Sequence, residues 1–189
     1  MKSYKNLYYL LLVFLFIRCS SNNSNDAIIE DSRHLVKHNP TDRDYATFFH
    51  ENYYDQLKIN NIMLFFTREN NQESPGALGL ILNHTQENPI SIKQYKFTIN
   101  GENTFYNPDN LYTIDDFEKK KTIISCQDTL NSKSFEIIKD IINSEQAKIQ
   151  YIGENDSIIY DIDEQLKTQL SQVIEAYIAM GGKLPQVLK

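Results

Sequence analysis

The pair Asn100-Gly101 is the feature of the sequence that most constrains its fold. It stands between two strand-like segments, residues 90–99 and 102–106. Asn-Gly is the preferred sequence of a two-residue type I′ turn, which joins antiparallel strands. The turn predicts three cross-strand pairs, which are Ile99 with Glu102, Phe97 with Thr104, and Tyr95 with Tyr106. The centre of the chain is therefore predicted to be an antiparallel hairpin.

Other short apolar segments predict further strands around this hairpin. Most are apolar at both even and odd positions, as expected of strands covered on both faces, and polar or turn residues separate them. They are residues 57–67, 76–82, 122–126, 147–152 and 157–162. The last two are predicted to form a second hairpin across Gly153-Glu154-Asn155. Gly79 predicts either a bulge or a site of close packing.

Three segments have helical spacing. Thr41-x-x-Asp44 resembles a capping box, and the aromatic residues that follow predict a short helix with an aromatic face, made by Tyr45, Phe48, Phe49 and Tyr53. A second helix is predicted to begin near Ser134 as its N-cap. A third is predicted after Asp161-x-x-Glu164, with its apolar face made by Leu166, Leu170, Val173, Ile174, Tyr177 and Ile178. The expected fold class is α+β, a mostly antiparallel sheet of about six or seven strands with two to three helices, including a C-terminal amphipathic helix.

The first residues have the pattern of a bacterial export signal that ends at a cysteine. Lys2 and Lys5 precede an apolar run from residue 7 to residue 17, which is too short for a transmembrane helix of roughly 20 residues. Leu15-Phe16-Ile17-Arg18-Cys19 then resembles the lipobox of bacterial lipoproteins. Arg18 replaces the usual small residue, as in the looser lipoboxes of the Bacteroidota.

This resemblance implies a signal peptide over residues 1–18 and a Cys19 that carries fatty acyl chains such as palmitate. The protein is then expected in the cell envelope, anchored to a membrane, with the outer membrane as the favoured one. Residues 19–40 are predicted to be a flexible tether, because Ser20–Asn25 contains nothing to bury. Residues 41–189 are predicted to form one globular domain. The order of segments over about residues 56 to 180 is similar to that of small uncharacterised bacterial lipoproteins. This resemblance implies an α+β sheet domain and does not point to any activity.

The charge of the chain argues against nucleic acid as a partner. The net charge is −6, and removal of residues 1–18 takes away three positive charges and no negative one, which gives −9. Binding to a phosphate backbone depends largely on Lys and Arg that displace counterions. An acidic surface without a basic stripe therefore excludes this class of partner.

No pattern in the sequence identifies a catalytic or metal site. Cys126 ends an apolar strand and is predicted to be a buried small hydrophobe. His34 and His38 stand four residues apart, but no third ligand is in register, and His50-Glu51 would join them only through the fold. Asp115, Asp116 and Glu118 lack the spacing of a calcium loop and predict a solvated loop. We therefore expect no enzyme, no metal and no cofactor, although a deep pocket with convergent polar groups would indicate an enzyme instead.

Two tripeptides resemble the acceptor sequence of the Bacteroidota O-glycosylation system. They are Asp128-Thr129-Leu130 and Asp156-Ser157-Ile158, and the resemblance implies Thr129 and Ser157 as candidate modified residues. Together with the lipobox, they predict an envelope lipoprotein that faces the periplasm or the exterior and acts as a non-catalytic binding or scaffold domain, with an envelope protein as partner. The alternative is an inhibitor or immunity lipoprotein whose acidic surface blocks a toxin or a hydrolase.

Overall fold

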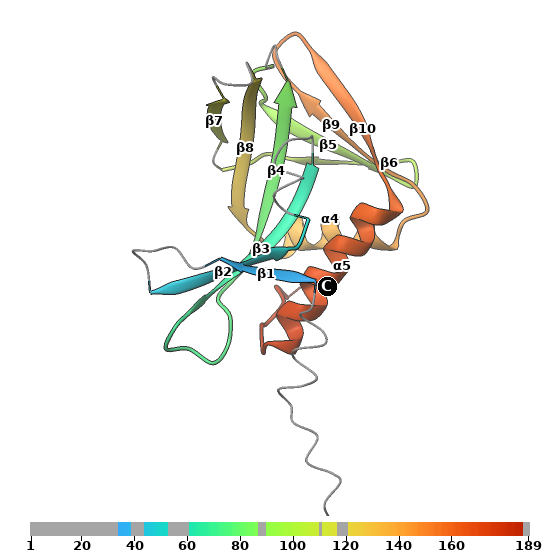
Figure 1. Cartoon of the computed structure of the whole chain (residues 1–189). Helices are drawn as coiled ribbons and strands as arrows, with labels where there is room; N and C mark the ends of the chain where they lie inside the picture. The colour runs from blue at the N-terminus through green and yellow to red at the C-terminus, as the bar shows by residue number, and fades with distance from the viewer. Residues whose placement is uncertain are drawn as a thin grey trace, which may run out of the picture.

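The computed structural model describes residues 34–38, 44–52, 61–86, 90–109, 111–116 and 121–186. These residues form an α+β fold, in which every strand pair is antiparallel (Figure 1). Sheet A contains, in spatial order, β1 (Leu35–His38), β2 (Tyr45–His50), β3 (Asn61–Glu69), β4 (Leu78–Gln86), β8 (Lys121–Thr129) and β7 (Leu111–Asp116). Sheet B contains β10 (Ser157–Ile162), β9 (Ala147–Ile152), β5 (Gln94–Ile99) and β6 (Glu102–Tyr106). The two helices of the described residues are α4 (Ser132–Asn143) and α5 (Glu164–Ala179).

The α+β class is confirmed, but the strands form two sheets of six and four strands rather than one of six or seven. Both predicted hairpins are present. All three predicted pairs across the first one are found, and its turn residues have the positive φ of a type I′ turn, 48° at Asn100 and 92° at Gly101. Sheet B arises because the two hairpins pair with each other through β5 and β9.

The hydrophobic core lies between the inner faces of the two sheets and the two helices. Sheet B contributes Tyr95, Phe97 and Tyr151, and sheet A contributes Phe66 and Leu82, all of them almost completely buried. Helix α5 packs against β2 and β3, and α4 packs against α5 and β5. Strands β5 and β6 run across β4 and β8 in Figure 1. Because the core is a single contiguous cluster, both sheets belong to one folded unit.

Residues 45–50 form strand β2, so the predicted aromatic helix is wrong. Phe48 lies opposite Phe66 on β3, with ring centroids 5.0 Å apart, and Phe49 lies opposite Phe65, at 6.0 Å. Aromatic cross-strand pairs of this kind stabilise a sheet. The spacing of the aromatic residues fits a helix equally well, and the decision depends on a partner strand that the local sequence does not specify.

Two predicted irregular segments also contain strands. Residues 35–38, placed in the predicted tether, form β1 and pair with β2, so the folded part begins before residue 41. Asp115 and Asp116, expected in a solvated loop, are the last two residues of β7 and pair with Thr122 and Lys121. The predicted residues Tyr53 and Glu118 lie outside the described residues.

Both helices begin at caps that differ from the predicted ones by two or three residues. Asn131 caps α4: its side chain accepts the N–H of Ser134 at 3.0 Å, and the Ser134 hydroxyl accepts the N–H of Asn131 at 2.9 Å. Ser134 is thus the third residue of a reciprocal capping box rather than the N-cap. Asp163, not Asp161, caps α5 and accepts the N–H of Leu166 at 2.8 Å.

Gly79 is a site of close packing, which was one of its two predicted roles. The ring of Phe65, its partner on β3, lies directly over it. A Cβ atom at residue 79 would come within 3.0 Å of three atoms of this ring. The absence of a side chain therefore lets Phe65 lie flat on the outer face of sheet A.

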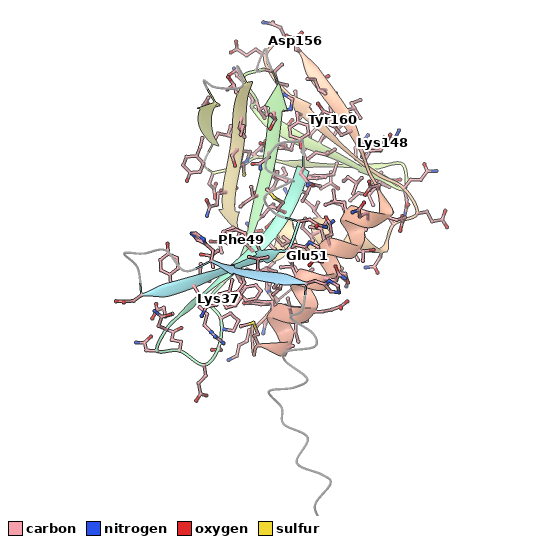
Figure 2. All side chains as sticks on the ribbon, viewed as in Figure 1. Lys37, Phe49, Glu51, Lys148, Asp156 and Tyr160 are labelled. Atoms are coloured by element: carbon pink, nitrogen blue, oxygen red, sulfur yellow. The ribbon has the colours of Figure 1, made fainter. Side chains whose placement is uncertain are left out.

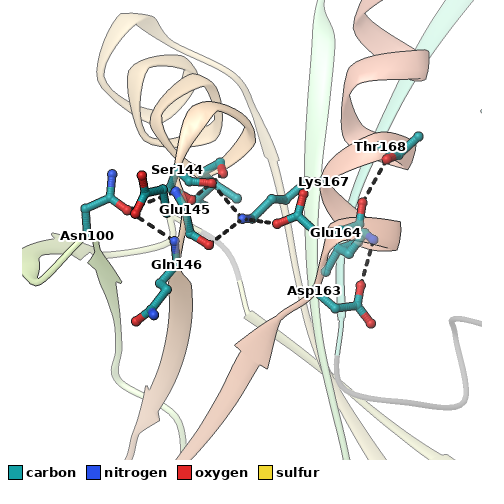
Figure 3. A network of polar contacts seen from close by, with 10 residues as sticks. Asn100, Ser144, Glu145, Gln146, Asp163, Glu164, Lys167 and Thr168 are labelled. Carbon is teal, nitrogen blue, oxygen red and sulfur yellow. Dashed lines mark hydrogen bonds and ion pairs between the residues drawn. The ribbon is translucent and has the colours of Figure 1, made fainter.

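A polar junction joins the end of α4 to sheet B and α5 (Figure 3). The side-chain oxygen of Asn100 accepts the N–H groups of Glu145 and Gln146, at 3.0 and 3.1 Å. From the other side, Lys167 donates its ammonium protons to the carbonyl of Ser144 at 2.8 Å and to that of Glu145 at 3.4 Å. Lys167 is only 3% exposed, and a positive charge is favourable beside the C-terminal end of a helix.

We expect Lys167→Met to lower the free energy of unfolding by about 1–3 kcal/mol, because two carbonyls lose their buried donor. Urea denaturation followed by circular dichroism measures this change. Lys148→Met is the matched control: Lys148 forms an exposed ion pair with Asp161 at 3.1 Å, which contributes at most about 1 kcal/mol. Equal losses in the two variants would contradict the role given to Lys167.

Candidate functional site

The residues predicted as modification sites fall in different surroundings. Cys19 lies outside the described residues. Thr129 ends β8 and Ser157 begins β10, and both are exposed. Asp128, which precedes Thr129, is buried, whereas Asp156 is exposed at the tip of the β9–β10 hairpin (Figure 2). Of the two tripeptides, only the one around Ser157 presents its acidic residue on the surface.

The described residues keep His34 and His38 apart and bring His34 beside His50. His34 lies directly before β1 and His38 ends it, and an extended backbone separates such residues by about 13 Å. The ring of His34 stacks on that of His50, with centroids 6.2 Å apart, and its Nδ1 lies 3.2 Å from Glu51 Oε1. His50 donates from Nε2 to Gln172 and accepts the N–H of Asn52 at Nδ1. Among the described residues, no group of three His, Cys, Asp or Glu could hold a metal ion.

A buried polar cluster connects the two sheets at Asp128. Its Oδ2 atom accepts the hydroxyl proton of Tyr106 on β6, and the N–H of Asp109 at 3.2 Å. The Sγ atom of Cys126, two residues earlier on β8, lies 3.4 Å from the same oxygen. Sequence reasoning missed this cluster, because Asp128 and Tyr106 are 22 residues apart and only the sheet packing brings them together.

The Asp128 cluster contains no activated nucleophile. Burial, with a smaller effect of the Asp128 charge, raises the pKa of the Cys126 thiol. Burial also raises the pKa of the Tyr106 and Tyr95 phenols. All three groups therefore stay protonated at neutral pH, whereas a catalytic cysteine needs a thiolate. The predicted burial of Cys126 is confirmed, and the cluster is a structural connection between the sheets.

The outer face of sheet B is open, and we call it the open face. Along β9, Ile149 and Tyr151 point to the core and are buried, while their neighbours Lys148 and Gln150 remain accessible. The side chain of Lys148 points outward in Figure 2. The strand registers align one row across all four strands of the sheet, and this row consists of Ile159, Gln150, Lys96 and Phe105.

Polar side chains on the open face pair with one another across the strands. Besides the pair of Lys148 and Asp161, these are Gln150 with Ser157 at 2.9 Å, Thr98 with Asn103 at 2.8 Å, and Gln94 with Asn107 at 2.7 Å. The two ends of the central row are apolar: Ile159 is 57% exposed and Phe105 is 47% exposed. The open face therefore combines ordered polar groups with accessible apolar ones.

Two surface cavities of the described residues contain no acidic side chain in their linings. One, of about 320 Å³, lies between α4 and α5 and is lined by Phe135, Lys139, Ile142, Ser171, Ile174 and Leu184. The other, of about 350 Å³, lies beside Gly76 and the end of α5. Its Tyr177 hydroxyl lies 2.8 Å from the Gly76 carbonyl. Neither lining contains an acid and a base that converge on a common point.

The described residues thus form a two-sheet α+β domain in which the outer face of sheet B is exposed. Comparisons with protein-family models, with curated proteins and with solved structures find no match to this chain. Within the part of the chain that the structure describes, neither helix has the length and hydrophobicity needed to cross a membrane.

We expect Cys126 in the folded chain to react with a thiol reagent at least about a hundredfold more slowly than in the unfolded chain, because it is buried and protonated. The rate at pH 8 with and without denaturant measures this, in a Cys19→Ser background. A fast reaction in the folded state would indicate an accessible thiolate instead.

Proposed function

We propose that the protein is a lipid-anchored protein of the bacterial cell envelope, and that its folded domain binds a partner protein without catalysis. The observation that carries this proposal is the open face of sheet B. It is an ordered surface with apolar residues at both edges, while the described cavities lack converging catalytic groups.

The composition of the open face fits a protein partner. An exposed aromatic side chain such as Phe105 offers a large contact area. The charged groups of this face are of both signs, with Lys96 and Lys148 against Asp161. This balance does not favour the alternative of an inhibitor that blocks a basic toxin through an acidic surface. A binding or scaffold domain is the better-supported function.

A lipid anchor at Cys19 is compatible with this surface being accessible. Cys19 precedes the start of β1 by 16 residues, and a chain of this length spans at most about 50 Å. Two or more acyl chains hold a protein stably at a membrane. The domain could therefore remain attached while it reaches a partner beyond the lipid headgroups.

The anchor is tested by Cys19→Ser. The parent chain should incorporate labelled palmitate and sediment with the envelope membranes, whereas the variant should lose the label and leave the membrane fraction, because it has no acylation site. Ser20→Ala is the neighbouring control and should behave as the parent. Unlabelled parent protein, or a variant that stays in the membrane, would contradict lipid anchoring at Cys19.

The binding surface is tested by photo-crosslinking in cells. A photoreactive amino acid at Lys96, in the centre of the open face, should form one discrete adduct with an envelope protein, because a bound partner covers it. The same substitution at Glu136, which is exposed on α4, should give no such adduct. Adducts at residue 136 alone, or none at residue 96, would contradict binding through the open face.

A further inference from the structure

Strand β10 is an edge strand with little protection against pairing. In sheet B it pairs with β9 on one side, and no described strand pairs with its other side. Its only charged residue, Asp161, forms an exposed ion pair with Lys148. Ile159, at its centre, is the most exposed of the large hydrophobic side chains of the described residues. An edge of this kind presents free N–H and C=O groups to another strand.

The other three edge strands of the described residues differ from β10 in length or charge. Strand β1 has only four residues, and its last two, Lys37 and His38, are exposed. Strand β7 ends in Asp115 and Asp116. Strand β6 begins with the exposed Glu102. Short length and charge are known protections of edge strands, so among the described strands the two edges of sheet A are better protected than β10. Strand β6, like β10, carries one charged residue and an exposed apolar side chain, Phe105.

The sequence of β10 is self-complementary. We propose that β10 pairs antiparallel with β10 of a second copy of this chain, around a two-fold axis at Ile159. In this register Ile159 lies opposite Ile159 of the second copy, on the open face. Ser157 lies opposite Asp161 of the second copy, so that a hydroxyl donor meets a carboxylate at both ends. On the inner face, the half-buried Ile158 meets the half-buried Tyr160.

This register also avoids repulsion between like charges. The two Asp161 side chains lie on opposite sides of the two-fold axis, separated by about 13 Å along the strands. The pairing would join the two copies of sheet B into one continuous sheet of eight strands, four from each chain. Because the contact uses the same patch on both copies, it closes as a dimer and does not propagate into a fibre.

A cysteine at residue 159 tests the register directly. Residues that face each other in an antiparallel pair have Cα atoms about 4.5–5.5 Å apart, which is within the range of a disulfide. The full chain with Ile159→Cys, in mild detergent, should form a disulfide-linked dimer on a non-reducing gel. Phe105→Cys, at an exposed position on the opposite edge of sheet B, should show only the background of the parent chain. Equal cross-linking in the two variants would overturn the proposal.

The dimer itself is tested by sedimentation of the full chain in density-matched detergent. The parent should be dimeric, and Ile159→Lys should weaken dimerisation at least about tenfold, because it places two ammonium groups at the axis. Phe105→Lys should remain dimeric, and circular dichroism shows whether each variant is folded. A parent that is monomeric up to about 100 µM would overturn the proposal. These outcomes do not depend on acylation of Cys19 or on a partner at the open face.

Discussion

The main-chain groups of Ser144, Glu145 and Gln146 occupy the point where α4 ends and β9 begins, and the arrangement of the molecule depends on their hydrogen bonds. Polar backbone groups at the end of a helix have no partner within it. Here Asn100, from the turn of the central hairpin, satisfies two N–H groups, and Lys167, from α5, satisfies two carbonyls. Three segments far apart in the sequence are thereby fixed in one place, which orients sheet B relative to both helices.

A second set of contacts fixes one sheet against the other. The hydroxyl of Tyr151 on β9 donates to the carbonyl of Asn83 on β4 at 2.9 Å, and Tyr106 on β6 donates to Asp128 on β8. Apolar packing favours burial but is not directional, so hydrogen bonds between buried groups help to select one orientation of the sheets. These bonds hold the inner faces of the two sheets together, so the outer face of sheet B stays accessible for the recognition that we propose.

Local sequence predicted the turn and the strand pairs of the first hairpin and the bounds of both strands of the second, because turn residues and alternating side chains act over a few positions. It failed at residues 45–50, where the pairing of Phe48 with Phe66 decides between helix and strand across a separation of 18 residues. The grouping of the two hairpins into sheet B depends on β5 meeting β9, a contact still more remote in sequence. The open face could not be predicted for the same reason: Ile159, Gln150, Lys96 and Phe105 form a row only once four strands are in order.

The burial of Cys126 has a consequence for how the protein ages. Oxidation of a cysteine begins at the thiolate and proceeds through sulfenic acid to irreversible products. In β8 the sulfur is covered by the core and shares a hydrogen-bonded oxygen with Tyr106, so an oxidant reaches it only when the two sheets separate. The amount of oxidised Cys126 would therefore depend on how long the two sheets of a chain have been separated. It would depend much less on how long the folded chain has been in an oxidising compartment.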